Sequence, residues 1–300
     1  MKKIILSFFT VLMSVSLFAG EPGSEALGFA RIDYNPASAG MAGAGIASAS
    51  NIAFAAYNNI AMVPWSGKTM DISAAYNLWA PGMAKGNSIS LGGAGRIGNL
   101  AVAAAGTYNM YPAVDKNKPG DMMFGAGVSY RIKNILSVGV NAKYANQRLT
   151  PNYTMGAFMA DIFLAGQWNG VSASVGVANV GGKASLKKDK KAQKEKYDIP
   201  MSLRFGAGYA KAFGKNAIEA QADADYYFSG AFSAAIGAQY AFDDMVFVRA
   251  GYRYGGKAVV PSYATLGLGF KFKGVKIDAY YMLANQALKN TFGVSLGYAF

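Results

Sequence analysis

The chain of 300 residues contains no cysteine and no histidine. Their absence excludes a disulfide framework, a metal site with His or Cys ligands, and Ser-His-Asp or Cys-His catalytic relays. Most classes of enzyme depend on one of these groups. We therefore predict that the protein is not an enzyme and holds neither a metal nor another cofactor.

Charged residues are also scarce, at 15% against about 25% in a typical soluble domain, while hydrophobic residues make up 52%. Only the first twenty residues form a long apolar run, so a transmembrane helix does not account for this apolarity. The chain is rich in other residues instead, with 37 Gly, 19 Tyr and 18 Phe. This composition favours closely packed strands and aromatic belts over helices.

Residues 1–19 have the layout of a secretory signal peptide, with Lys2 and Lys3, an apolar core, and small residues at Ala19 and Gly20. The alternative, a membrane-anchoring helix, is disfavoured because the apolar core is short and no stop-transfer flank follows it. Removing the segment lowers the net charge from +13 to +11. An exported protein rarely meets nucleic acid, so we predict no nucleic-acid partner despite this basic balance.

Residues 69–300 divide into fourteen short segments in which large apolar residues alternate with small or polar ones. The last of them, FGVSLGYAF at 292–300, places Phe, Val, Leu, Tyr and Phe on one face of a strand. Most segments are close to the nine to eleven residues with which a tilted strand crosses a bilayer. The first segment, 70–79, has to pair with the last, because an open edge is not tolerated in lipid.

The connections between these segments alternate in length, from tight turns such as Asn169-Gly170 to longer links such as 110–121 and 181–200. This alternation is typical of outer-membrane barrels, so we predict an all-β fold, a 14-stranded antiparallel transmembrane β-barrel, in the bacterial outer membrane. One short link, Ser229-Gly230, predicts a low rim. A soluble β-sandwich or lipocalin-like barrel is the alternative, but its core needs bulky residues inside.

Charged residues recur on the strand faces opposite the bulky ones, and we expect these faces to line the lumen because charge on a lipid face is costly. We predict a lumen network of three arginines and three acids. It either fills and rigidifies the interior or lines a substrate path. Its members are Arg204, Glu219, Asp223, Asp225, Arg249 and Arg253.

Two further motifs have competing interpretations. The lysine run LKKDKKAQKEK at 186–196 falls in the longest predicted outer loop, where it either is solvated and mobile or contacts anionic lipopolysaccharide or a protein partner. The sequence MAGAG at 41–45 is rich in glycine but lacks the preceding strand and the GK[ST] ending of a phosphate-binding loop. We therefore do not interpret it as a nucleotide site.

Residues 20–68 do not alternate and are too apolar for a solvated tail, so they need cover. A fourteen-stranded lumen is wider than side chains alone can fill, and we predict that this segment forms a plug or hatch inside the barrel.

The segment resembles the PorV/PorQ family of Bacteroidetes outer-membrane proteins, which is related to the FadL-like transporters. The resemblance rests on a Phe-led extended start at 29–32, the Gly- and Ala-rich run at 39–47, and a Tyr-Asn turn at 57–59. Asn-Pro-Ala stands before the Gly-rich run, at 35–37, instead of after it. The resemblance implies a hatch with these candidate residues: Phe29, Arg31, Asn35, Pro36, Gly43, Gly45, Asn58 and Asn59.

The resemblance also implies two functions. A PorV-like protein would be an accessory of type IX protein secretion or surface attachment, with secretion-system proteins and secreted cargo as partners. A FadL-like protein would take up long-chain fatty acids or other hydrophobic molecules. A third hypothesis is a structural barrel without transport.

The chain ends on Leu296, Tyr298 and Phe300 at alternating positions, which resembles the C-terminal signal by which outer-membrane barrels are recognised for assembly. We predict this role for the three residues, with outer-membrane lipid or lipopolysaccharide around the barrel.

Overall fold

A computed structural model describes residues 25–80, 85–113, 117–256, 261–286 and 288–300. The predicted signal peptide, residues 1–19, lies outside these ranges, as does the start of the predicted plug.

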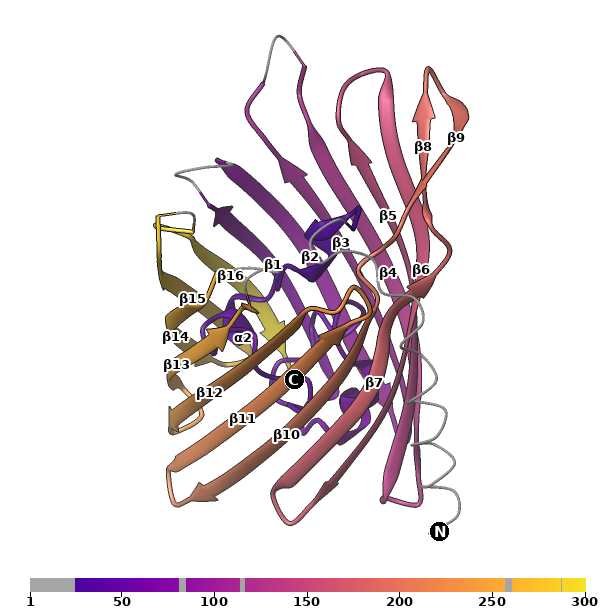
Figure 1. Cartoon of the computed structure of the whole chain (residues 1–300). Coiled ribbons are helices and arrows are strands. Elements are labelled where there is room, and N and C mark those ends of the chain that lie inside the picture. Colours follow the sequence, from indigo (N-terminus) through magenta and orange to yellow (C-terminus); the bar gives the residue numbers. More distant parts are fainter. Residues whose placement is uncertain (1–24, 81–84, 114–116, 257–260, 287) are drawn as a thin grey trace.

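The described chain is almost entirely antiparallel sheet, and fourteen of its strands close into a barrel (Figure 1). Neighbours in sequence are neighbours in space, except that β7 pairs with β10. The predicted fold is confirmed. The barrel strands are β1 Met70–Trp79, β2 Gly86–Ile97, β3 Leu100–Met110, β4 Gly120–Ile132, β5 Leu136–Arg148, β6 Tyr153–Trp168, β7 Val171–Gly181, β10 Ser202–Phe213, β11 Asn216–Tyr227, β12 Phe232–Phe242, β13 Val246–Tyr254, β14 Tyr263–Phe272, β15 Val275–Ala284 and β16 Phe292–Ala299.

Alternation along each strand sorts the side chains by chemistry. On β14, Leu266, Leu268 and Phe270 are exposed on the outside, while Thr265 of the same strand faces the interior and is buried. On β11 the outward residues are Ile218, Ala220, Ala222, Ala224 and Tyr226, and the inward ones are Glu219, Gln221, Asp223, Asp225 and Tyr227. Bulk on the outside and charge inside is favourable only where lipid surrounds the barrel.

The barrel closes where the sequence predicts, between its first and last strands. Asp71 pairs with Ala299 and Leu78 with Phe292, in antiparallel register. The amides of Thr69 and Met70 both donate to the carbonyl of Phe300, so the final residue still belongs to the seam. Closure leaves no unpaired strand edge in the wall.

The links after even-numbered barrel strands are tight turns, and most of those at the other end are longer, as the sequence predicts. The link after β11 is only residues 228–231, which makes the rim low there. The link at 182–201 differs from the predicted loop, because β8 Ala184–Lys188 pairs with β6 and β9 Lys191–Tyr197 pairs with β8. The lysine run therefore lies in a hairpin that extends the wall (Figure 1).

The segment before β1 runs through the interior of the barrel (Figure 1, indigo). Its described part, from residue 25 on, contains three short helices, η1 Gly28–Arg31, α2 Pro36–Ala39 and η2 Ile60–Trp65. Asn35 caps α2 by accepting from the amide of Ala37, with Pro36 in the first turn, and Asn59 caps η2 in the same way. No helix among the described residues is long and apolar enough to cross a membrane.

Glycines in the wall let this interior segment approach the strands closely. A Cβ atom on Gly139 in β5 would lie 2.6 Å from the amide nitrogen of Ala61. On the opposite side, a Cβ atom on Gly237 in β12 would lie 2.6 Å from the carbonyl oxygen of Met41. The wall is therefore shaped to the backbone of the segment on both sides.

Candidate functional site

The inward carboxylates of β11 bind the interior segment directly. The Oδ2 atom of Asp223 accepts from the amides of Gly45 at 2.7 Å and Ile46 at 3.0 Å. Four residues nearer the tight-turn end of β11, Glu219 accepts from the hydroxyls of Ser48 and Ser50, each at 2.5 Å. We call these contacts of residues 40–50 with β11, β13 and β14 the polar latch.

Arg253 and Thr265 complete the latch. The Nε atom of Arg253 donates to the carbonyl of Ala42 at 2.9 Å, and Nη2 donates to the carbonyl of Gly43 at 3.3 Å. The hydroxyl of Thr265 in β14 accepts from the amide of Ala42 and donates to the carbonyl of Gly40. These bonds satisfy backbone groups that the irregular segment leaves unpaired.

Asp225 is shared by two arginines. Its Oδ1 atom lies 2.8 Å from Nε of Arg204, and its Oδ2 atom lies 3.1 Å from Nη1 of Arg253. Arg204 also donates to the side-chain oxygen of Asn58, at 3.2 Å. The cluster thus joins β10, β11 and β13 to the interior segment.

The predicted lumen network is divided in the structure. Arg204, Asp225 and Arg253 form one cluster, whereas Asp223 and Glu219 bind the interior segment. Arg249 pairs with Asp278 in β15 at 2.7 Å instead of with an acid of β11. Period-two alternation places these residues in the lumen, but their partners depend on the register and on the interior segment.

The residues that carry the family resemblance all lie in the interior segment. Phe29 is buried in η1, and Arg31 pairs with Glu25 at 2.7 Å and stacks over the ring of Tyr227. Gly43 adopts a φ of 72°, which favours glycine, beside the guanidinium of Arg253. Asn59 donates to Ser174 of β7 at 2.7 Å.

An upper cavity of about 430 Å³ lies between the interior segment and the wall, at the end of the barrel with the longer links. Its apolar lining is mainly aromatic, and its polar lining includes Arg31, Asp33 and Arg253. These three residues also line a second cavity, the middle cavity described below. The hydroxyl of Ser38 and the amide of Asn35 donate to Asp33, but burial is the larger effect and raises the pKa of this carboxyl. The aromatic and other apolar residues of the lining are Phe29, Ile32, Ala39, Trp79, Tyr111, Tyr227, Tyr263, Tyr280 and Met282.

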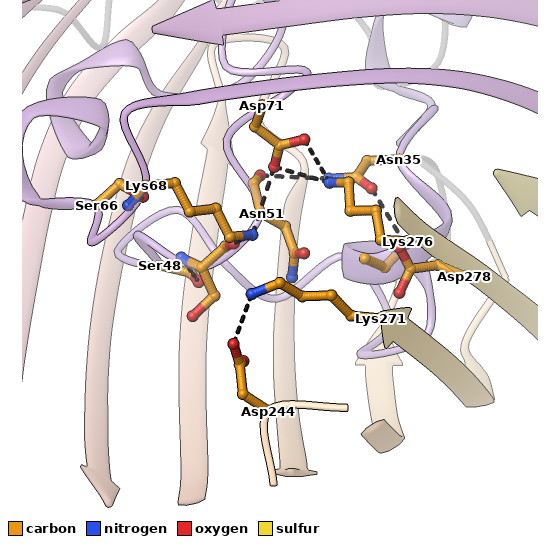
Figure 2. A network of polar contacts seen from close by, with 12 residues as sticks. Asn35, Ser48, Asn51, Ser66, Lys68, Asp71, Asp244, Lys271, Lys276 and Asp278 are labelled. Atoms are coloured by element: carbon orange, nitrogen blue, oxygen red, sulfur yellow. Dashed lines mark hydrogen bonds and ion pairs between the residues drawn. The ribbon is translucent and has the colours of Figure 1, made fainter. Parts of the chain in front are cut away.

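Two further cavities continue toward the tight-turn end. A middle cavity of about 90 Å³ lies among Lys143, Arg204, Asp225 and Arg253, with room for about three water molecules. It shares Asn51 with a lower cavity of about 520 Å³. Beside the lower cavity, Lys68 and Lys276 both approach Asp71 and Lys271 approaches Asp244 (Figure 2).

The sequence prediction does not single out the aromatic residues of the upper cavity. Tyr227, Tyr263, Tyr280 and Met282 all occupy inward positions near strand ends at the long-link end. The alternation pattern could have identified them, because most inward positions carry small residues and an aromatic residue at such a position stands out.

Solved structures with the same fold were found, although no family model and no curated protein matches the sequence. The toluene transporter TbuX of Ralstonia pickettii is 14% identical with a TM-score of 0.62, covering 89% of this chain and 97% of TbuX. A FadL homologue of Pseudomonas aeruginosa is 12% identical with a TM-score of 0.58, covering 93% and 100%. The protein Omp33 of Acinetobacter baumannii is 11% identical with a TM-score of 0.51, covering 78% and 98%.

The chain therefore has a FadL-like fold. A fourteen-stranded barrel with an apolar outer surface belongs in the bacterial outer membrane, as predicted. At these identities the comparisons concern the fold, and the PorV/PorQ resemblance stays a prediction.

Proposed function

We propose that this protein admits small hydrophobic molecules through the outer membrane and that they bind first in the upper cavity. The observation that carries the proposal is that six aromatic side chains gather in the lining of that cavity. Its volume of about 430 Å³ falls within the range of about 300–1,000 Å³ that is usual for small-molecule sites.

Tyr227, Tyr280 and Met282 are buried in the barrel although they line this space. Aromatic rings provide apolar surface together with preferred stacking geometries for another ring. Two structures of similar fold are described as a toluene transporter and a monoaromatic hydrocarbon channel, and this supports a ligand of single-ring size. It also supports a transport protein that is not an enzyme.

A straight path down the barrel requires movement of the interior segment. The middle cavity is small, and its lining is charged through Lys143, Arg204, Asp225 and Arg253. An apolar molecule would have to displace water from these groups without replacing its hydrogen bonds, which is costly. We therefore propose that the cavity loads in the conformation described and that release follows a shift of the polar latch.

The function in type IX secretion that the PorV/PorQ resemblance implies takes second place. The solved structures compared above do not name a secretion component, and two of them name hydrocarbon transport. Pull-down from native outer membranes with mass spectrometry of proteins and lipids distinguishes the two functions. Recovery of cargo proteins without hydrophobic ligands would favour the function in secretion over hydrophobic uptake.

Binding can be measured with Trp79 as the reporter. In the double variant Trp65→Phe/Trp168→Phe, Trp79 is the remaining tryptophan of the three in the chain, and it lines the upper cavity. Titration of the purified protein with toluene in detergent should change the Trp79 emission with saturation. The Trp79→Phe variant, which keeps the two remote tryptophans, should show no saturable change.

Transport can be tested by filling the mouth of the cavity. A Cβ atom on Gly28, which lines the upper cavity, would have no heavy atom within 4 Å, and the same is true of Gly67 at the lower cavity. Gly28→Leu should lower toluene uptake by cells that produce the protein, by about fivefold or more, whereas Gly67→Leu should not. Equal uptake by wild type, Gly28→Leu and cells without the protein would contradict the proposal.

A further inference from the structure

The β8–β9 hairpin continues the barrel wall beyond β6 (Figure 1). The strand register gives its position. Tyr153 to Gly156 of β6 pair with Lys188 to Ser185 of β8. β9 then adds one more strand beside β8, so the wall formed by β4, β5 and β6 is extended at its upper edge.

The outward face of this wall carries an aromatic row. Phe124 of β4 pairs with Tyr144 of β5, and Tyr144 pairs with Phe158 of β6. Phe124 and Phe158 are exposed by 56% and 76%. Aromatic rows of this kind lie at the membrane–water interface of outer-membrane barrels.

Basic residues lie on the same outward face, two and four residues beyond the aromatic row. Four residues beyond the aromatic row along the strands, Arg148 of β5 pairs with Thr154 of β6, and Thr154 pairs with Lys187 of β8. Two residues beyond the aromatic row, Gly156 of β6 pairs with Ser185 of β8, and Ser185 pairs with Lys196 of β9.

The inward face is fixed independently by Leu186. This residue pairs with buried Met155 and packs against the interior cluster that contains Leu27 and Phe29. Its neighbours Ser185 and Lys187 must therefore point outward. On β9, Lys196 pairs with Ser185 and therefore shares its outward face, and the register shifts between this pair and the pair of Ala192 with Lys187.

We call the exposed residues Arg148, Lys187 and Lys196 the outer basic rim. Two nearby acids lie apart from it. Asp189 lies in the turn of the hairpin, and Asp198 pairs with Lys183 at 3.1 Å.

The height of the outer basic rim matches a lipid headgroup layer. A strand rises about 3.3 Å per residue, and barrel strands tilt by about 40°, so the rim lies about 5–10 Å beyond the aromatic row along the membrane normal. The headgroup region adds about 5–7 Å to each side of the hydrocarbon core.

We propose that the outer basic rim binds the phosphate groups of a phosphorylated glycolipid in the outer leaflet of the outer membrane. Lysine and arginine provide charge-assisted hydrogen bonds to phosphate oxygens. The outward direction, shared with lipid-facing aromatics, favours a lipid over an acidic protein above the membrane. This site is independent of what the lumen carries.

The experiment compares two triple variants that lose the same charge. The test variant is Arg148→Gln/Lys187→Gln/Lys196→Gln, on the outward face. The control is Lys188→Gln/Lys190→Gln/Lys191→Gln, at the tip and on the inward face. Native mass spectrometry of the full protein in detergent follows binding of diphosphorylated lipid A and of its dephosphorylated form.

The wild type should bind the diphosphorylated form at least tenfold more tightly than the dephosphorylated form. The test variant should lose at least tenfold in affinity, because each basic residue near an anionic surface contributes substantially, and the control less than threefold. Equal losses in both variants, no loss in either, or no preference for phosphate would overturn the proposal. So would rim-dependent binding of a polyglutamate peptide in preference to lipid A. Both variants should keep the gel mobility of the folded barrel.

Discussion

At the scale of single residues, the lumen contains buried charges that form ion pairs. Asp225 has a side chain that is 2% exposed and is shared by Arg204 and Arg253. Such a pair contributes little net stability when intact, because desolvation offsets the attraction, but removing one partner leaves uncompensated charge. Within this cluster, removing the shared carboxylate of Asp225 should therefore lower the stability of the protein most.

Replacing Asp225 by Asn should lower the free energy of unfolding by about 3–5 kcal/mol, because it leaves two guanidinium groups without their acid. Urea unfolding in detergent micelles measures this loss. The matched control is Asp243→Asn in the exposed pair with Lys215, where the side chains are 41% and 70% exposed, and it should cost less than about 1 kcal/mol. Similar losses for both variants would contradict the buried-cluster account.

Replacing Gly237 by Ala should disturb the interior segment, because the new Cβ atom would lie 2.6 Å from the carbonyl oxygen of Met41. We expect a loss of about 1–3 kcal/mol, as is usual for overpacking. Gly93→Ala is the control, since its Cβ atom would meet Ile72 at an ordinary 3.5 Å. The temperature at which the folded gel band disappears should fall for Gly237→Ala alone.

At the scale of elements, the two halves of the interior segment differ in their contacts with the wall. Residues 52–63 pack into an apolar cluster with Ala75, Ala94, Ala101 and Ala103 of the wall. Residues 40–50 are also buried, but they add the polar latch, in which Asp223 accepts hydrogen bonds from two backbone amides. Because polar contacts can exchange with water more readily than packed apolar groups can separate, the latch half is the half that can move.

Replacing Asp223 by Ala should therefore raise hydrogen exchange over residues 43–50 by at least tenfold and leave residues 52–63 unchanged. The reciprocal control is Ser129→Ala, which removes a hydrogen bond to the carbonyl of Ile60. Packing should keep residues 52–63 protected in that variant. Uniform loss of protection after Asp223→Ala would show that the segment moves as one unit.

At the scale of the whole molecule, the wall is a closed ring whose final strand completes it. Phe292, Val294, Leu296, Tyr298 and Phe300 are exposed on the outer face of β16. The sequence predicts this face, and the structure confirms it. Recognition of Leu296, Tyr298 and Phe300 by assembly machinery stays a prediction.

Replacing Phe300 by Ala separates assembly from stability. The seam bonds of residue 300 use only its backbone, so protein refolded into detergent should keep the faster mobility of unheated folded barrels. In cells, the same variant should show a reduced fraction of folded protein in the outer membrane. A normal folded fraction in cells would exclude an assembly function for this side chain.

Much of the fold could be predicted because each strand repeats one local rule. Period-two alternation identifies the fourteen barrel strands and their faces, and turn residues separate them. The β8–β9 hairpin was missed because its strands, rich in lysine and exposed, lack the alternation that lipid and lumen impose. The position of the segment inside the barrel can be predicted only because the segment is too apolar to be exposed to water.

The sequence by itself determines which residues face lipid, which face the lumen, and which strands close the ring, because these properties depend on alternation and on the cost of an open edge in lipid. Tertiary structure alone decides that Asp223 binds backbone amides, that Asp225 joins two arginines, and that Arg249 pairs with Asp278. It also decides where aromatic residues gather into a cavity. Such contacts join residues far apart in the chain, and their geometry is fixed only when the strand register and the path of the interior segment are both set.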